Sequence, residues 1–113
     1  MARHYLNTPL TLEAQDWVSD GAGGRTANGW SALGILWAEL DFRSGRRVAR
    51  DTASAGRTAV NIILRAAPIG AAERPLPGQR LRDGARMFRI LAVAEKDSSG
   101  RLLRCFCEEE QVA

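Results

Sequence analysis

Residues 58–66 have the sequence TAVNIILRA, which shows the clearest secondary-structure pattern in the chain. Val60, Ile62 and Leu64 alternate with residues that point the other way, and a period of two is typical of a half-buried β-strand. The same reasoning predicts further strands at residues 8–18, 30–42, 79–83, 86–95 and 101–109. With turn signals between them, these segments predict an all-β fold, either a sandwich or a small barrel of about six to seven strands.

Two of these segments extend the alternation over a longer stretch. In residues 8–18, the apolar side chains of one face are Leu10, Leu12, Ala14 and Val18. In residues 30–42, the corresponding side chains are Leu36, Ala38, Leu40 and Phe42. An α-helix is the alternative for residues 30–42, because alanine, leucine and glutamate are good helix formers.

The segment between these two strands, residues 20–29, is rich in glycine. Its sequence DGAGGRTANG contains four glycines together with Asp20 and Asn28, which favour turns and offer little to pack. A glycine-rich stretch can cradle phosphate, but no Gly-Lys-Ser/Thr follows here and no helical pattern begins after it. We therefore expect a flexible hairpin loop at residues 20–29.

Residues 43–57, with the sequence RSGRRVARDTASAGR, form a second irregular segment. The apolar alternation stops there, and arginine, serine, alanine and glycine dominate. We expect one long inter-strand loop, which could include a short helix across residues 47–53. Connections of this length inside a compact domain are uncommon and are usually functional or disordered. The segment is therefore the first place to look for a functional site.

Length and composition fit a single domain over residues 1–113. Of these residues 45% are hydrophobic, which is enough for one modest core. No apolar run approaches the roughly 20 residues that cross a bilayer, and residues 1–10 lack the apolar stretch of a secretory signal. We expect a soluble protein made inside a cell, with no membrane contact and with residues 1–7 flexible.

The charge of the chain is unevenly distributed. The formal net charge is +3, and Lys96 is the only lysine among 16 cationic residues. Residues 43–89 carry eleven arginines against three carboxylates, whereas residues 108–110 are all glutamate. Such a field favours a polyanionic neighbour such as DNA, or a partner ring of opposite charge.

The residues that usually perform catalysis or bind metal are sparse. His4 is the only histidine, and the two cysteines, Cys105 and Cys107, would share one face of a strand, where buried reduced thiols are expected. No serine has a histidine nearby in the sequence, and the glutamates at 108–110 alternate faces. We expect neither an enzyme, nor a metal site, nor a cofactor.

The predicted long loop has two interpretations. Its candidate residues are Arg43, Ser44, Gly45, Arg46, Arg47 and Arg50. The arginines could be solvated loop charges, or they could face DNA phosphates, since arginine contacts to the backbone give sequence-independent binding. Nothing in the sequence matches a helix-turn-helix, a zinc finger or an aromatic RNA-binding strand. Any contact with DNA is therefore expected to be nonspecific.

A family resemblance extends over nearly the whole chain. It is carried by TPLTLEA at residues 8–14, GILWAELDFRSGRRVARD at 34–51, AVNIILRAAP at 59–68 and GARMFRILAVAEKDSSGRLLRCFCEEE at 84–110. These stretches resemble the phage head-tail joining family, whose members are also called head-completion or stopper proteins. The more specific elements are Trp37-Ala38-Glu39 leading into Ser44-Gly45-Arg46, then Ile63-Leu64-Arg65, residues 86–93 and residues 105–108.

Two details refine this resemblance. Where the family usually has an acidic residue after Ser-Gly-Arg, this chain has Arg47, which puts in doubt a salt bridge that relatives would form there. The short, arginine-rich and alanine-rich character is similar to versions from gene transfer agents of α-proteobacteria.

The resemblance implies a small β-barrel that assembles as a six-fold or twelve-fold homo-oligomeric ring at the virion neck. Its implied partners are the portal and adaptor, a tail-terminator or tail-tube protein, and packaged double-stranded DNA. The protein would be made in the bacterial cytoplasm. The loop at residues 43–57 would then face the channel, and sheet edges, the hairpin at residues 20–29, Trp30 and Trp37 are candidate subunit contacts.

Two alternatives remain open at this point. A free-standing, nonspecific nucleic-acid-binding β-barrel would explain the charge, although single-strand binders use aromatic platforms and most aromatic residues here occupy core-like positions. A tail-terminator or minor tail protein is also a small β-subunit of a ring. The passage from Trp37-Ala38-Glu39 to Ser44-Gly45-Arg46 favours the head-tail connector.

Overall fold

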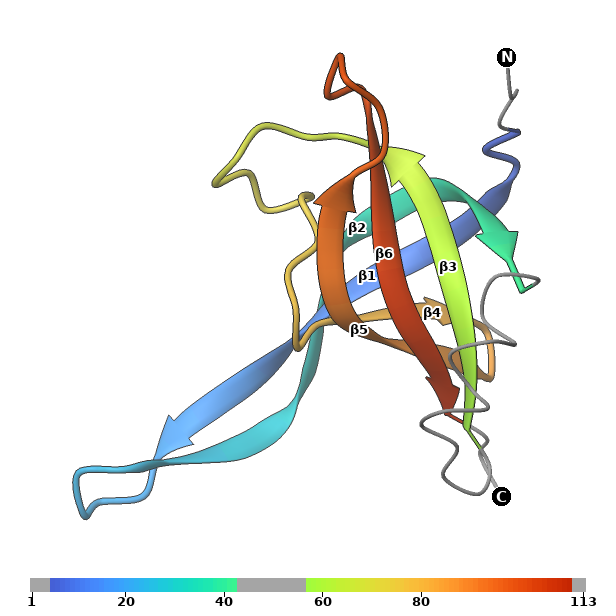
Figure 1. The fold of residues 1–113 in the computed structure, drawn as a ribbon. Helices are drawn as coiled ribbons and strands as arrows, with labels where there is room; N and C mark the ends of the chain where they lie inside the picture. Colours follow the sequence, from blue (N-terminus) through green and yellow to red (C-terminus); the bar gives the residue numbers. More distant parts are fainter. Residues whose placement is uncertain (1–4, 43–56, 111–113) are drawn as a thin grey trace.

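The structure, a computed structural model, describes residues 5–42 and 57–110 (Figure 1). The described strands are β1 (Thr8–Ser19), β2 (Arg25–Asp41), β3 (Arg57–Arg65), β4 (Arg80–Asp83), β5 (Arg86–Glu95) and β6 (Leu102–Glu110). No helix occurs among these residues, so the helical alternative for residues 30–42 is wrong. The predictions for residues 1–4 and 43–56 lie outside the described residues.

The strands close into a barrel in the order β1-β2-β3-β6-β5-β4. All neighbouring pairs are antiparallel, and β4 closes the ring by pairing with β1 through Leu12 opposite Leu81. Closure leaves no free edge in the barrel wall, which removes the usual site of unwanted strand pairing. The predicted all-β fold is confirmed.

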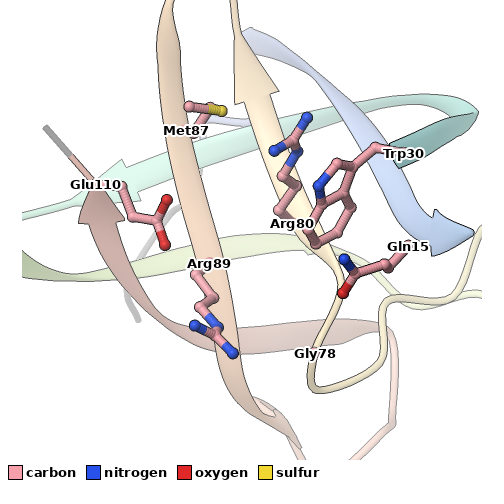
Figure 2. A pocket seen from close by; sticks show the side chains of 7 residues that line it. All are labelled: Gln15, Trp30, Gly78, Arg80, Met87, Arg89 and Glu110. Atoms are coloured by element: carbon pink, nitrogen blue, oxygen red, sulfur yellow. The ribbon is translucent and has the colours of Figure 1, made fainter. Parts of the chain in front are cut away.

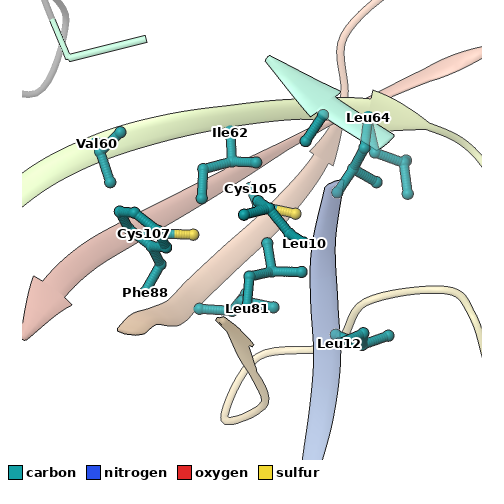
Figure 3. Packing of buried hydrophobic residues seen from close by; sticks show 12 residues of the cluster. Leu10, Leu12, Val60, Ile62, Leu64, Leu81, Phe88, Cys105 and Cys107 are labelled. Atoms are coloured by element: carbon teal, nitrogen blue, oxygen red, sulfur yellow. The ribbon is translucent and has the colours of Figure 1, made fainter. Parts of the chain in front are cut away.

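The core lies inside the barrel and is built from the inward faces of all six strands (Figure 3). Val60, Ile62 and Leu64 are at most 1% exposed, as their alternation predicts. The other buried members are Leu10, Leu12, Ala38, Leu81, Phe88, Ile90, Leu103, Cys105 and Cys107. Leu36 and Leu40 of β2, and Phe42 directly after it, pack against this cluster, which confirms the predicted face of that segment.

The segment between β3 and β4 is irregular and forms no strand. Pro75 is buried there, and Nη1 of Arg74 donates a hydrogen bond to the carbonyl oxygen of Ala67 at 2.7 Å. Gly78 has φ of 91°, a conformation that favours glycine. Proline and glycine therefore end β3 and delay the start of β4, as the sequence predicts.

Strands β1 and β2 continue past the barrel as a two-stranded arm, which we define as residues 14–33 (Figure 1). The pairing shifts register after Leu12 and again after Gln15, and β-bulges of this kind bend a ribbon. The expected flexible loop at residues 20–29 is wrong in its extent, because β2 begins at Arg25 and only residues 20–24 turn the chain. Val18, predicted to face the core, is 45% exposed because it lies beyond the second bulge.

Candidate assembly surfaces

The base of the arm is fixed to the barrel by a charged stack, of which Figure 2 shows Arg80 and Trp30. Glu13 is only 8% exposed, and its Oε1 accepts a hydrogen bond from Nε of Arg80 at 2.6 Å. The guanidinium of Arg80 lies over the ring of Trp30, 4.1 Å from its centroid. Nη1 of Arg82 lies 3.7 Å from Oε2 of Glu13. Glu13 thus links β1 to β4 where the first bulge turns the arm away.

Trp30, a predicted subunit contact, is therefore already engaged within its own chain. Its half-buried ring lines a shallow pocket of about 220 Å³. The other lining residues are Gln15, Gly78, Arg80, Met87, Arg89 and Glu110. The pocket has charged groups of both signs but no histidine, cysteine, serine or threonine. Its chemistry suits ion pairing and packing, and it offers no nucleophile.

Trp37, the second predicted subunit contact, lies on the outer wall of β2 and is 57% exposed. It lines a groove of about 1150 Å³ at the end of the barrel where β1 begins and β3 ends. Ile35 lies in the same groove and is 67% exposed. We refer to this surface as the barrel-end groove, which is lined mainly by Leu6, Ile35, Trp37, Arg65, Arg101 and Leu102.

The other end of the barrel carries an ion pair across its mouth. Arg86 donates hydrogen bonds from Nε and Nη2 to the two carboxylate oxygens of Glu109, at 2.6 and 2.9 Å. The guanidinium lies 5.3 Å from the ring centroids of both Phe42 and Phe88. The hydrogen bond with Glu109 raises the pKa of Arg86 above its usual value. The pair lies at the edge of the core, beside the fully buried ring of Phe88.

The two cysteines have the environment that the sequence predicts. Both are free and buried, and their side chains point into the core (Figure 3). Burial raises the pKa of Cys105 to about 12 and raises the pKa of Cys107 as well. A thiol must ionise to act as a nucleophile or metal ligand, so these groups are poorly suited to either role.

The described part of the chain contains no group of three or more potential metal ligands. The same residues form no helix that is long and apolar enough to cross a membrane. Among the predicted site residues, Arg43, Ser44, Gly45, Arg46, Arg47 and Arg50 lie outside the described residues. The structure brings Trp37 and Ile35 together in the barrel-end groove, but it separates Trp30 from them.

Sequence reasoning missed the Glu13–Arg80 pair, whose members are far apart in the chain. No local pattern connects residues so distant, and only the barrel closure brings them together. Ile35 could have been identified from the sequence as a candidate contact residue. Like Trp37, it is a large apolar residue on the face of β2 opposite the predicted core residues.

The comparisons with known proteins decide the family. The model of the phage head completion protein family matches residues 1–110. The chain belongs to this family. A chain in the solved virion of a native gene transfer agent particle is 45% identical, covers 100% of both chains and has a TM-score of 0.73. The chain is accordingly a structural protein with a role in completing the virion head.

A second solved structure shows the fold alone. The solution structure of protein SF1141 from Shigella flexneri 2a is 20% identical, covers 96% of both chains and has a TM-score of 0.68. A barrel of this plan therefore persists where few side chains are shared. A comparison with curated protein sequences found no match.

Proposed function

We propose that this head completion protein is a non-enzymatic ring subunit at the virion neck, where it joins the portal and adaptor to the tail. The observation that carries this proposal is the family match over residues 1–110, together with 45% identity over the full length to a chain of a gene transfer agent virion. A small closed barrel with exposed aromatic residues at its end and on its arm supports a role in assembly.

The proposal also specifies the oligomer, which is a ring of six or twelve copies of this chain. A channel that passes DNA has rotational symmetry, and repeating one small subunit around it multiplies each weak contact. A domain of this size also gains stability from its neighbours in a ring.

Cryo-electron microscopy of particles from the producing cell tests the position and symmetry of the subunit. We expect density for this barrel as a symmetric ring between portal and tail. Particles without the chain, combined with salt-dependent binding of free DNA by the purified protein, would instead favour a free-standing nucleic-acid-binding barrel.

Retention of packaged DNA is a separate element of the proposal. The arginines at positions 46, 47 and 50 would contact DNA phosphates without reading sequence, as the composition of residues 43–57 suggests. Replacing Arg46, Arg47 and Arg50 with alanine should lower the amount of nuclease-protected DNA per particle. Arg89→Ala, at an exposed position on the barrel wall, serves as the control and should leave DNA content unchanged. Normal DNA content in the triple variant would exclude this role.

A further inference from the structure

The arm exposes most of its surface and has few bonds to the rest of the chain. Strand β1 pairs with β4 only over Thr11–Glu13, and β2 pairs with β3 only over Ala38–Asp41. Within the described residues, the arm is therefore a ribbon of two strands with both outer edges unpaired. Isolated two-stranded hairpins are marginally stable in water. An arm of this kind gains most from a surface that covers it.

The arm presents an apolar pair near its tip. Trp17 and Val18 are 47% and 45% exposed, and they lie on opposite faces of the ribbon. The guanidinium of Arg25 lies 4.5 Å from the centroid of the Trp17 ring and holds that ring against the ribbon. Aromatic residues fixed in this way are frequent anchors of protein interfaces.

The barrel-end groove offers a complementary surface. Ile35 and Trp37 supply its exposed apolar wall, and Arg65 and Arg101 supply positive charge. Neither guanidinium has a hydrogen-bond or ion-pair partner among the described residues. Asp97, the acid in the groove, accepts hydrogen bonds from Ser99 Oγ and from the backbone N–H groups of Arg101 and Leu102, which lower its pKa. It keeps its charge, so the two arginines leave the groove with a net positive charge.

The charge on the arm has the opposite sign. Asp16 and Asp20 give its described residues two carboxylates, while Arg25 is its only cation and covers Trp17. Asp20 accepts hydrogen bonds from the backbone N–H groups of Ala22 and Gly24, which lowers its pKa and keeps it ionised. An acidic tip and a groove with two unpaired arginines are electrostatically complementary.

One chain cannot make this contact with itself. Strand β2 runs from the tip of the arm to the groove, and at a rise of about 3.3 Å per residue Arg25 and Trp37 lie roughly 40 Å apart along it. The arm and the β5–β6 turn beside the groove point to opposite sides of the molecule (Figure 1). Two different surfaces on opposite sides produce a head-to-tail contact, and such contacts form a ring when the rotation from copy to copy closes on itself.

We propose that the tip of the arm of one copy docks in the barrel-end groove of the next copy. Trp17, on one face of the ribbon, packs against Ile35 and Trp37, and Val18, on the opposite face, is turned toward Arg101 and Leu102. This inference rests on the proposed ring. Specific interfaces engage roughly 20–30 residues on each side, which is about the length of the arm. The contact buries apolar surface that each copy leaves exposed, and it gives every subunit one donor surface and one acceptor surface.

Photo-cross-linking in assembled particles tests the contact directly. A photoreactive residue replaces Val18 in the full chain, and mass spectrometry identifies the residues that it joins. We expect a ladder of cross-linked copies of this chain, with attachment at residues 35–37, 65–66 or 100–102. Attachment only to another protein, or only to other parts of this chain, would overturn the docking proposal while the chain remains a neck component. Particles that lack the chain would overturn the proposed function as well.

Charge-introducing variants provide a second test. Trp17→Glu changes the arm and Trp37→Glu changes the groove, and both positions are exposed, so the barrel should still fold. Each should lower the yield of the cross-linked ladder by about tenfold or more, as expected when an interface anchor is lost. Ile69→Asp, at a position that is 87% exposed in the β3–β4 connection, is the matched control and should leave the yield unchanged. A normal ladder from folded Trp37→Glu protein would exclude the groove as the acceptor.

Discussion

The barrel and the arm share strands β1 and β2, yet the two regions are held together in different ways. At the barrel end of β1, Leu10 and Leu12 are fully buried, and Leu12 has strand neighbours on both sides. At the arm end of the same strand, Trp17 and Val18 are about half exposed, and the strand pairs with β2 alone. A single strand can therefore serve stability at one end and recognition at the other.

The point where the two regions meet is chemically distinct from both. The first bulge follows Leu12, and the next residue, Glu13, forms the ion pair with Arg80. Arg80 in turn covers Trp30 on the second strand of the arm. These contacts tie the base of the arm to β4, directly beside the bulge that bends the ribbon.

The largest expected effect separates the two regions by their aromatic residues. Phe88→Ala removes a fully buried ring from the barrel core and should lower the free energy of unfolding by about 3–5 kcal/mol. Trp17→Ala on the arm should lower it by less than about 1 kcal/mol, because the ring is 47% exposed. Urea denaturation of the purified chain measures both. Equal losses in the two variants would mean that the arm is part of the cooperative core.

The next effect concerns the junction. Glu13→Ala leaves the half-buried guanidinium of Arg80 without its carboxylate, which should lower the free energy of unfolding by about 2–3 kcal/mol. Glu95→Ala removes an exposed carboxylate from β5 and is the matched control, with an expected change within about 0.5 kcal/mol. Denaturant unfolding compares the two variants. A change in Glu13→Ala no larger than in the control would show that the arm needs no such anchor.

This contrast also explains which features the sequence could predict. Alternation identified the strands because each barrel strand buries one face, and residues 58–66 show it most clearly. The same rule assigned Val18 to the core, because strict alternation does not predict where a β-bulge interrupts the pattern. The extent of the arm was missed because its exposed strand residues, including Thr26 and Asn28, have the polar composition of a loop.

The candidate surfaces follow the same division. Trp37 could be chosen from sequence because it is a large apolar residue on the solvent face of a predicted strand. The partner of Trp30 could not be predicted from sequence, because Arg80 contacts the Trp30 ring only when β4 pairs with β1 and closes the barrel. Contacts of this kind depend on the register between distant strands, which single-sequence patterns do not specify.

A smaller effect should appear at alkaline pH and should arise from the barrel alone. The thiols ionise near pH 9 in the unfolded chain, but burial raises the pKa of Cys105 to about 12 in the folded state. The contribution of the protonated thiols to stability is fully present below pH 9 and is lost as the pH rises toward 12. At pH 10 the loss should be about 1 kcal/mol per buried thiol.

Comparison of unfolding at pH 8 and pH 10 measures this loss. A variant with Cys105→Ala and Cys107→Ala should lose less stability than the parent chain between these two values, because it lacks the thiols while its other titrating groups are the same. Losses of equal size would assign the alkaline sensitivity to groups outside the core.

The smallest effect on global stability should come from the tip of the arm. Asp20→Ala removes the acceptor for the N–H groups of Ala22 and Gly24, which lie in the turn between β1 and β2. We expect the free energy of unfolding to change by less than about 0.5 kcal/mol, because the arm opens locally without unfolding the barrel. Amide hydrogen exchange should nevertheless accelerate across residues 17–27 and stay unchanged in β3 and β6.

Equal acceleration of exchange in the barrel strands would show that the arm does not open independently of the barrel. If exchange instead slows in assembled particles and the substitution restores it, the arm acquires its order from the surface that it contacts.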